Sequence, residues 1–288
     1  MRYVYLNGRV LPESEAHLPV DDRAVLFGDA AYETVRSYRG RYFRFPEHLD
    51  RLRHTVEGMG LTLPYPDADI LAGAEELLAR NNLSDARLRL TLTGGKHEGA
   101  IRLKRPHPPN LILSAFPLTL PAPETYAAGV DVVISEWAVH SDSPLPRIKT
   151  VNRLMHLMAK EAALEAGAYE SLFLDETGAF LEGTATNLFL VVDGELLTPG
   201  LNTPILAGVT RDVVLAEARE AGLPVRETRI PREAAARASE GFLTGSTIEL
   251  LPIRTLDGVR LGGPGPIVAD LTRRYRSRVA RETGLEDS

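Results

Sequence analysis

The stretch Pro146-Arg147-Ile148-Lys149-Thr150-Val151-Asn152 lies near the middle of the chain and contains one of its only four lysines. Lys149 stands between Ile148 and Val151, and a helical pattern begins directly after it. Apolar surroundings lower the pKa of a lysine because burial disfavours the charged form, and a neutral amine can form a Schiff base. A lysine that only extends along an apolar surface at a helix start fits the same residues.

Around this stretch, strand and helix patterns alternate, which predicts an α+β fold in two domains. Strict alternation over Arg87–Thr93 predicts a strand with one exposed face. The proline-rich run Pro117–Pro123 has no period and predicts a linker. We expect a small N-terminal α/β domain over 1–118, a linker over 119–125 and a larger, β-rich domain over 126–288. Helices are expected over residues 67–80, 150–166, 209–221 and 267–281.

The composition excludes several classes of protein. With 33 basic and 39 acidic residues the net charge is −6, which argues against a dedicated nucleic-acid binder. No apolar run approaches the ~20 residues that span a bilayer, and the N-terminus lacks the apolar core of a signal peptide, so we expect a cytoplasmic protein. The absence of cysteine removes thiol chemistry, and the seven histidines show no metal-ligand spacing.

Three further segments could share a site with Lys149. Glu182 stands at a predicted strand end beside Gly183, where it could also be a plain turn residue. Thr210 opens a helix, either as a simple N-cap or as part of an anion site. The turn Thr244-Gly245-Ser246-Thr247 could wrap a phosphate, and Arg51 could supply a cation unless it is merely solvated.

An amine, a carboxylate and a phosphate cradle without a metal are the groups that pyridoxal phosphate requires. The amine holds the aldehyde, and the carboxylate keeps the pyridine nitrogen protonated. The order of these motifs resembles the class IV, or fold type IV, pyridoxal phosphate enzymes. The resemblance runs from Phe27-Gly28-Asp29 to Glu249–Pro252 and includes Ile148–Asn152, Glu182–Phe189 and Gly208–Arg211.

This resemblance implies a small N-terminal α/β domain, a larger β-barrel-like domain with helices, and a homodimer with the active site near the dimer interface. By match of motif, Lys149 is the Schiff-base lysine and Glu182 is the partner of the pyridine nitrogen. The same match implies a phosphate site made by Arg51, Val209, Thr210, Ser246 and Thr247. Tyr32 matches a position in the substrate pocket.

The implied reaction moves an amino group between an amino acid and a 2-oxo acid in a ping-pong sequence. Branched-chain aminotransferases carry a tyrosine five residues after the lysine, where this chain has Leu154. D-Amino acid aminotransferases carry an Arg-x-His carboxylate trap after the strand at Leu88. Here the segment reads Thr93-Gly94-Gly95-Lys96-His97-Glu98-Gly99, so the trap is missing in its usual form. Arg36, Lys96 or His97 could bind the substrate carboxylate, or each could be a solvent-facing charge.

Three hypotheses follow. The first is an aminotransferase for D-amino acids or branched-chain amino acids. The second is an elimination of the aminodeoxychorismate lyase type, suggested by the run Lys149–Leu154. The third is a cofactor-binding homologue without catalysis, against which the presence of both Lys149 and Glu182 argues.

Overall fold

The computed structural model describes residues 1–285, and its contacts divide them into two compact units. Unit 1 contains residues 1–119 together with the short segment 148–152, and unit 2 contains 120–147 and the residues from 153 onward. The segment around Lys149 therefore groups with unit 1, although it follows the predicted linker in the chain.

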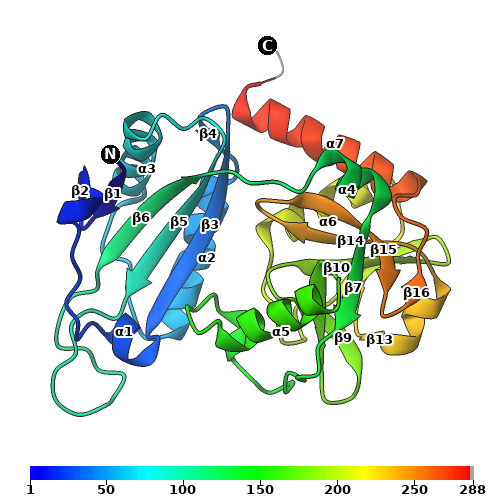
Figure 1. Ribbon diagram of the computed structural model, residues 1–288, viewed down its shortest axis with the longest axis horizontal. Coiled ribbons are helices and arrows are strands. Elements are labelled where there is room, and N and C mark those ends of the chain that lie inside the picture. The colour runs from blue at the N-terminus through cyan, green and yellow to red at the C-terminus, as the bar shows by residue number, and fades with distance from the viewer. Residues whose placement is uncertain (286–288) are drawn as a thin grey trace. The chain divides into compact units, whose positions relative to one another are not determined.

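Unit 1 is a six-stranded antiparallel sheet with two helices packed on one face (Figure 1). Its strands, in spatial order, are β2 (Arg9–Pro12), β1 (Tyr3–Leu6), β6 (Leu111–Pro117), β5 (Ala86–Thr93), β3 (Ala30–Tyr38) and β4 (Arg41–Tyr42). Its helices are the short α1 (Arg23–Phe27) and the longer α2 (Phe45–Gly58) and α3 (Asp67–Arg80), and Glu13–Glu15 forms a 3₁₀ turn.

The alternation predicted for Arg87–Thr93 is confirmed in β5. Leu88, Leu90 and Leu92 are fully buried and join one apolar core with Leu49 and Leu52 of α2. The alternate residues, including Arg87 and Arg89, lie on the opposite face because side chains alternate along a strand. This second face carries the polar residues that matter below.

Unit 2 contains a ten-stranded mixed sheet, part of which closes into a barrel. Six strands form a complete circuit, since β9 also pairs with β10. In order around it they are β10 (Asn187–Val192), β14 (Ala238–Gly245), β15 (Glu249–Leu256), β7 (Val130–Ile134), β8 (Glu170–Leu174) and β9 (Ala179–Gly183). The edges add β11 (Glu195–Pro199), β12 (Val225–Thr228), β13 (Ile230–Pro231) and β16 (Val259–Arg260).

Apolar side chains from the barrel strands form the core of unit 2. Leu188 and Leu190 of β10 meet Leu243 of β14 in this cluster, while Phe189 and Phe242 stack on the other face with ring centroids 4.8 Å apart. Four helices pack on the strands (Figure 1): α4 (Pro123–Ala128), α5 (Leu154–Glu165), α6 (Val209–Glu220) and α7 (Pro266–Thr283). Leu145–Arg147 and Arg232–Arg237 are 3₁₀ segments.

One prediction about an element boundary is wrong. The helix expected from Thr150 begins only at Leu154, because residues 149–151 are extended and pair with the edge of β3. Helix α4 begins at Pro123, inside the run expected as a linker over 119–125, and proline suits the first turn of a helix.

Candidate active site

In unit 1 the backbone of Lys149 is fixed by hydrogen bonds to β3. The amide of Tyr32 donates to the carbonyl of Lys149 at 2.9 Å, and the amide of Val151 donates to the carbonyl of Ala30 at 3.0 Å. The amide of Lys149 also donates to Oγ1 of Thr55 at 3.2 Å. A strand-like segment therefore presents Lys149 between β3 and α2, and its Nζ lies 4.7 Å from the centroid of the Tyr32 ring.

The predicted phosphate cation Arg51 makes a two-pronged ion pair. Its Nε and Nη2 donate to the two carboxylate oxygens of Glu33 at 2.7 and 2.8 Å. Nδ1 of His48 lies 2.9 Å from the same carboxylate, whose side chain is 0% exposed. His48 and Arg51 share a face of α2 because they are three residues apart. The pair fixes the plane of the guanidinium.

The charges around Glu33 follow from burial and its partners. Burial would raise the pKa of Glu33, but the charge and hydrogen bonds of Arg51 and His48 outweigh burial and hold this pKa well below its usual range. Burial lowers the pKa of His48, and the nearby cations Arg51 and Lys149 lower it further against the opposing effect of Glu33.

The second face of the sheet carries two arginines that lie over tyrosine rings of β3. The guanidinium carbon of Arg89 lies 3.8 Å from the Tyr32 ring centroid, and that of Arg36 lies 4.2 Å from the ring of Tyr38. Arg36 was expected near the substrate, whereas Arg89 was not singled out from the sequence. The alternation in Arg87–Thr93 places Arg89 on the exposed face of its strand. The sequence does not show that this strand, β5, pairs with β3 beside Tyr32.

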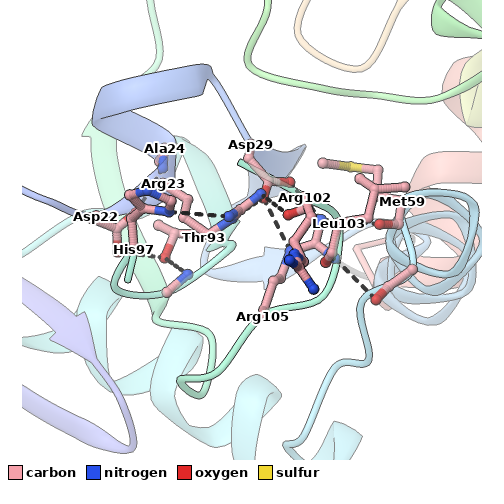
Figure 2. A network of polar contacts seen from close by, with 12 residues as sticks. Asp22, Arg23, Ala24, Asp29, Met59, Thr93, His97, Arg102, Leu103 and Arg105 are labelled. Carbon is pink, nitrogen blue, oxygen red and sulfur yellow. Dashed lines mark hydrogen bonds and ion pairs between the residues drawn. The ribbon is translucent and has the colours of Figure 1, made fainter. Parts of the chain in front are cut away.

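His97 belongs to a polar network around Asp29 (Figure 2), and Lys96 lies next to it in the chain. Lys96 pairs with Asp21 at 3.7 Å. The His97 ring packs edge-on against Phe27, and its Nδ1 lies 3.4 Å from Nη1 of Arg23. These contacts hold both residues on the loop that connects β5 and β6.

Unit 2 carries the predicted carboxylate at the point where the barrel closes. Glu182 at the end of β9 lies directly opposite Asn187 at the start of β10. Oε2 of Glu182 accepts from Nδ2 of Asn187 at 3.1 Å and from the amide of Leu206 at 2.9 Å. Asn187 also donates to the carbonyl of Leu206, so the carboxylate is held by two elements.

Val209 and Thr210 form the first turn of α6. Gly208, and not Thr210, is the N-cap residue, and no side chain caps this helix. A Cβ atom at Gly208 would lie 2.0 Å from Oδ1 of Asn187, so only glycine allows the helix to start this close to β10. The uncapped start leaves amide donors and a positive helix end beside Asn187.

Ser246 and Thr247 lie in the turn between β14 and β15. Thr244, which precedes this turn, pairs with Asn187 across the strands. Asn187 therefore stands between Glu182, the start of α6 and the hydroxyl-rich turn. Oγ1 of Thr244 is buried and has no hydrogen-bond partner in the structure.

Other kinds of site find no support in the part of the chain that the structure describes. Over residues 1–285, no group of three or more histidine and acidic side chains could hold a metal ion. No helix in that range is both long and apolar enough to cross a bilayer.

Comparison with known proteins places these features in a family. A sequence model of the family described as amino-transferase class IV matches residues 30–256. A putative branched-chain-amino-acid aminotransferase of Methanocaldococcus jannaschii is 33% identical over 255 residues, which cover 88% of each chain. A D-alanine aminotransferase of Bacillus licheniformis is 30% identical over 285 residues, covering 97% of this chain and 98% of its own.

The fold agrees with that of solved relatives. A branched-chain amino acid aminotransferase of T.th., solved in complex with N-(5'-phosphopyridoxyl)-L-glutamate, aligns with a TM-score of 0.90 at 26% identity, covering 99% of this chain and 95% of that chain. The fold type IV expectation is thereby confirmed. The chain belongs to the amino-transferase class IV family, and it is a transaminase of the kind that uses pyridoxal 5'-phosphate.

Proposed function

We propose that this enzyme transfers the amino group between a D-amino acid or branched-chain amino acid and a 2-oxo acid, with Lys149 as its catalytic residue. The observation that carries the proposal is the fixed backbone of Lys149, which sets its amine 4.7 Å from the Tyr32 ring. The relatives that match include aminotransferases of both substrate types.

The residues of unit 2 fit a phosphorylated pyridine. The start of α6 offers amides that no side chain caps. Asn187 lies so close to Gly208 that no side chain would fit there. The buried hydroxyl of Thr244 has no hydrogen-bond partner. Amides and hydroxyls at a positive helix end suit a phosphate, and a fixed carboxylate such as Glu182 suits a protonated ring nitrogen. Pyridoxal phosphate supplies an aldehyde that condenses with amines and a ring that withdraws electrons from the Cα atom of an amino acid.

Each residue then has a defined task. Lys149 would hold the aldehyde carbon and, once released by the substrate amine, would carry the Cα proton on Nζ. Glu182 would keep the ring nitrogen protonated. The phosphate would be held by Arg51, Val209, Thr210, Ser246 and Thr247.

The substrate carboxylate needs a cation close to the amine of Lys149. Arg89 and Lys149 both lie over the Tyr32 ring, so their charged groups are separated by no more than the sum of 3.8 and 4.7 Å. This supports Arg89 as the binding residue, with Arg36 as a further candidate from its position in the sequence. Lys96 and His97 remain candidates from their position in the sequence.

We further propose a cytoplasmic homodimer with the active site near the dimer interface. Leu154, Leu157 and Met158 on α5 are 71, 64 and 47% exposed, which is unusual for apolar side chains so close together. Burial of this surface against a second copy would stabilise it.

A half-reaction panel tests the function. The purified enzyme with pyridoxal phosphate should absorb visible light, and Lys149→Ala should abolish this absorbance. D-Alanine and L-leucine are then offered separately, each without a second oxo acid, and conversion of the absorbance by either one supports amino transfer. No response to either, with pyruvate release from aminodeoxychorismate, would instead support the lyase. A chain that takes up no cofactor contradicts the whole proposal.

A further inference from the structure

The barrel closes where Glu182 pairs with Asn187, and the short turn between these two residues is held by several contacts. Residues 183–186 link Glu182 to Asn187, and the amide of Gly183 donates to the carbonyl of Thr186 at 2.7 Å. A Cβ atom at Gly183 would lie 2.2 Å from Oγ1 of Thr186, so the Thr186 side chain packs directly against the backbone of Gly183. Arg153 donates to the carbonyl of Thr184 from outside the turn.

A buried carboxylate on the neighbouring strand β8 accepts hydrogen bonds from the same turn. Glu170 on β8 is 1% exposed. It accepts from Oγ1 of Thr184 at 2.6 Å, from Oγ1 of Thr186 at 3.2 Å and from the amide of Ser171 at 3.0 Å. All three donors are neutral. A carboxylate buried without a cation is costly, so its position here calls for a role.

We propose that Glu170 is a positioning residue for Glu182, acting through the two threonines of the turn. This inference rests on the proposed function, in which the carboxylate of Glu182 faces the ring nitrogen of the cofactor. The turn has only four residues, and Glu170 holds two of their side chains. With the turn fixed, the separation of its ends is fixed too, and Glu182 meets Asn187 at 3.1 Å.

Two substitutions of Glu170 separate the effect of its hydrogen bonds from the effect of its negative charge. In Glu170→Ala both hydroxyl contacts are lost. In Glu170→Gln one oxygen still accepts from Thr184, and the new amide can donate to Thr186, whose hydroxyl also accepts. A positioning role therefore predicts that the glutamine restores what the alanine removes.

The first experiment titrates each variant with pyridoxal phosphate and follows its visible absorbance. We expect Glu170→Ala to raise the dissociation constant about tenfold, the size expected when hydrogen bonds to a charged group are lost, and Glu170→Gln to stay within about threefold of the parent. Thr184→Val, which removes only one of the contacts, should raise the constant in the same direction. Glu176→Ala, at an exposed glutamate of the same unit, is the matched control and should change nothing.

The second experiment asks whether Glu170 acts through Glu182. In an enzyme that already carries Glu182→Gln, adding Glu170→Ala should change the dissociation constant by less than about twofold, because the carboxylate to be positioned is gone. An equal effect in both backgrounds, or a glutamine variant as weak as the alanine, would overturn the proposal. Unchanged binding by Glu170→Ala would overturn it as well.

Failure of the proposed function gives a different result. In that case the parent enzyme would not bind the cofactor through Lys149, and the parent titration alone would reveal it. Melting of the cofactor-free variants identifies any that fail to fold, and Thr184→Val then replaces Glu170→Ala in the cycle with Glu182→Gln.

Discussion

At the scale of single residues, one buried carboxylate orients the predicted phosphate cation of unit 1. Glu33 occupies both Nε and Nη2 of Arg51 and contacts His48 as well. An arginine forms such a fork with a carboxylate because its donors lie in one rigid plane, and a lysine cannot reproduce it. The orientation of the predicted phosphate cation is therefore set by its partner and not by its charge alone.

Arg51→Lys tests this point because it keeps the charge and removes the fork. We expect pyridoxal phosphate to bind about tenfold more weakly, since a single ammonium cannot satisfy both Glu33 and a phosphate. Absorbance titration measures the effect. Arg53→Lys is the control, because Arg53 lies on the same helix and pairs with Asp67 at the surface. Equal affinities of the two variants would contradict the prediction.

At the scale of elements, a loop is fixed by a pair of arginines that share one aspartate (Figure 2). Arg105 donates to Asp29 at 2.6 and 3.0 Å and also to the carbonyls of Met59, Gly60 and Leu103. Arg23 donates to Asp29 at 2.6 Å and to the carbonyl of Arg102 at 3.0 Å. The loop between β5 and β6 is thereby tied to α1, to Asp29 just before β3 and to the two residues that follow α2.

The stability provided by Asp29 depends on pH with a definite sign. Burial would raise the pKa of Asp29, but the hydrogen bonds and charges of Arg105 and Arg23 lower it below its ordinary range. Because the folded pKa lies below the unfolded value of about 4, the stabilisation is complete above that pH and is lost as the pH falls through the folded pKa.

Asp29→Asn should therefore lower the free energy of unfolding by about 3 kcal/mol at pH 7, because two buried guanidinium groups lose their counterion. Urea unfolding at several pH values measures the difference between variant and parent. The difference should be constant from pH 7 to about pH 5 and should shrink below about pH 4. A difference that grows towards acid would contradict the assignment.

At the scale of the whole molecule, the exposed leucines and methionine of α5 support the proposed dimer. A charge placed among them should prevent association, because its burial would be costly. We expect Leu157→Glu to halve the mass seen by sedimentation, whereas Leu201→Glu, at a leucine outside any helix, should leave it unchanged. A parent enzyme that sediments as a monomer, or a Leu157→Glu variant that remains dimeric, would contradict the proposed interface.

Much of the local structure could be predicted because periodicity is a local property. The alternation of β5 and the apolar faces of α3, α6 and α7 are written in adjacent residues, and their bounds were predicted within two residues. The helix start at Thr150 was wrong because the backbone of residues 149–151 bonds to Ala30 and Tyr32, far away in the chain. No local pattern contains that information.

The sequence by itself determined the family, and motifs of a few neighbouring residues predict Lys149 and Glu182 as the reactive groups together with a cofactor phosphate site. Only the tertiary structure decided what holds these groups. The register of the strands places Glu182 opposite Asn187, and the pairing of β5 with β3 brings Arg89 to the Tyr32 ring. The packing of α2 on β3 sets Arg51 against Glu33. The hydrogen bond from Thr184 to Glu170 likewise joins a turn and a separate strand of the barrel. Contacts between elements that are far apart in the sequence fix these positions. They depend on how the whole chain folds and not on any short stretch of sequence.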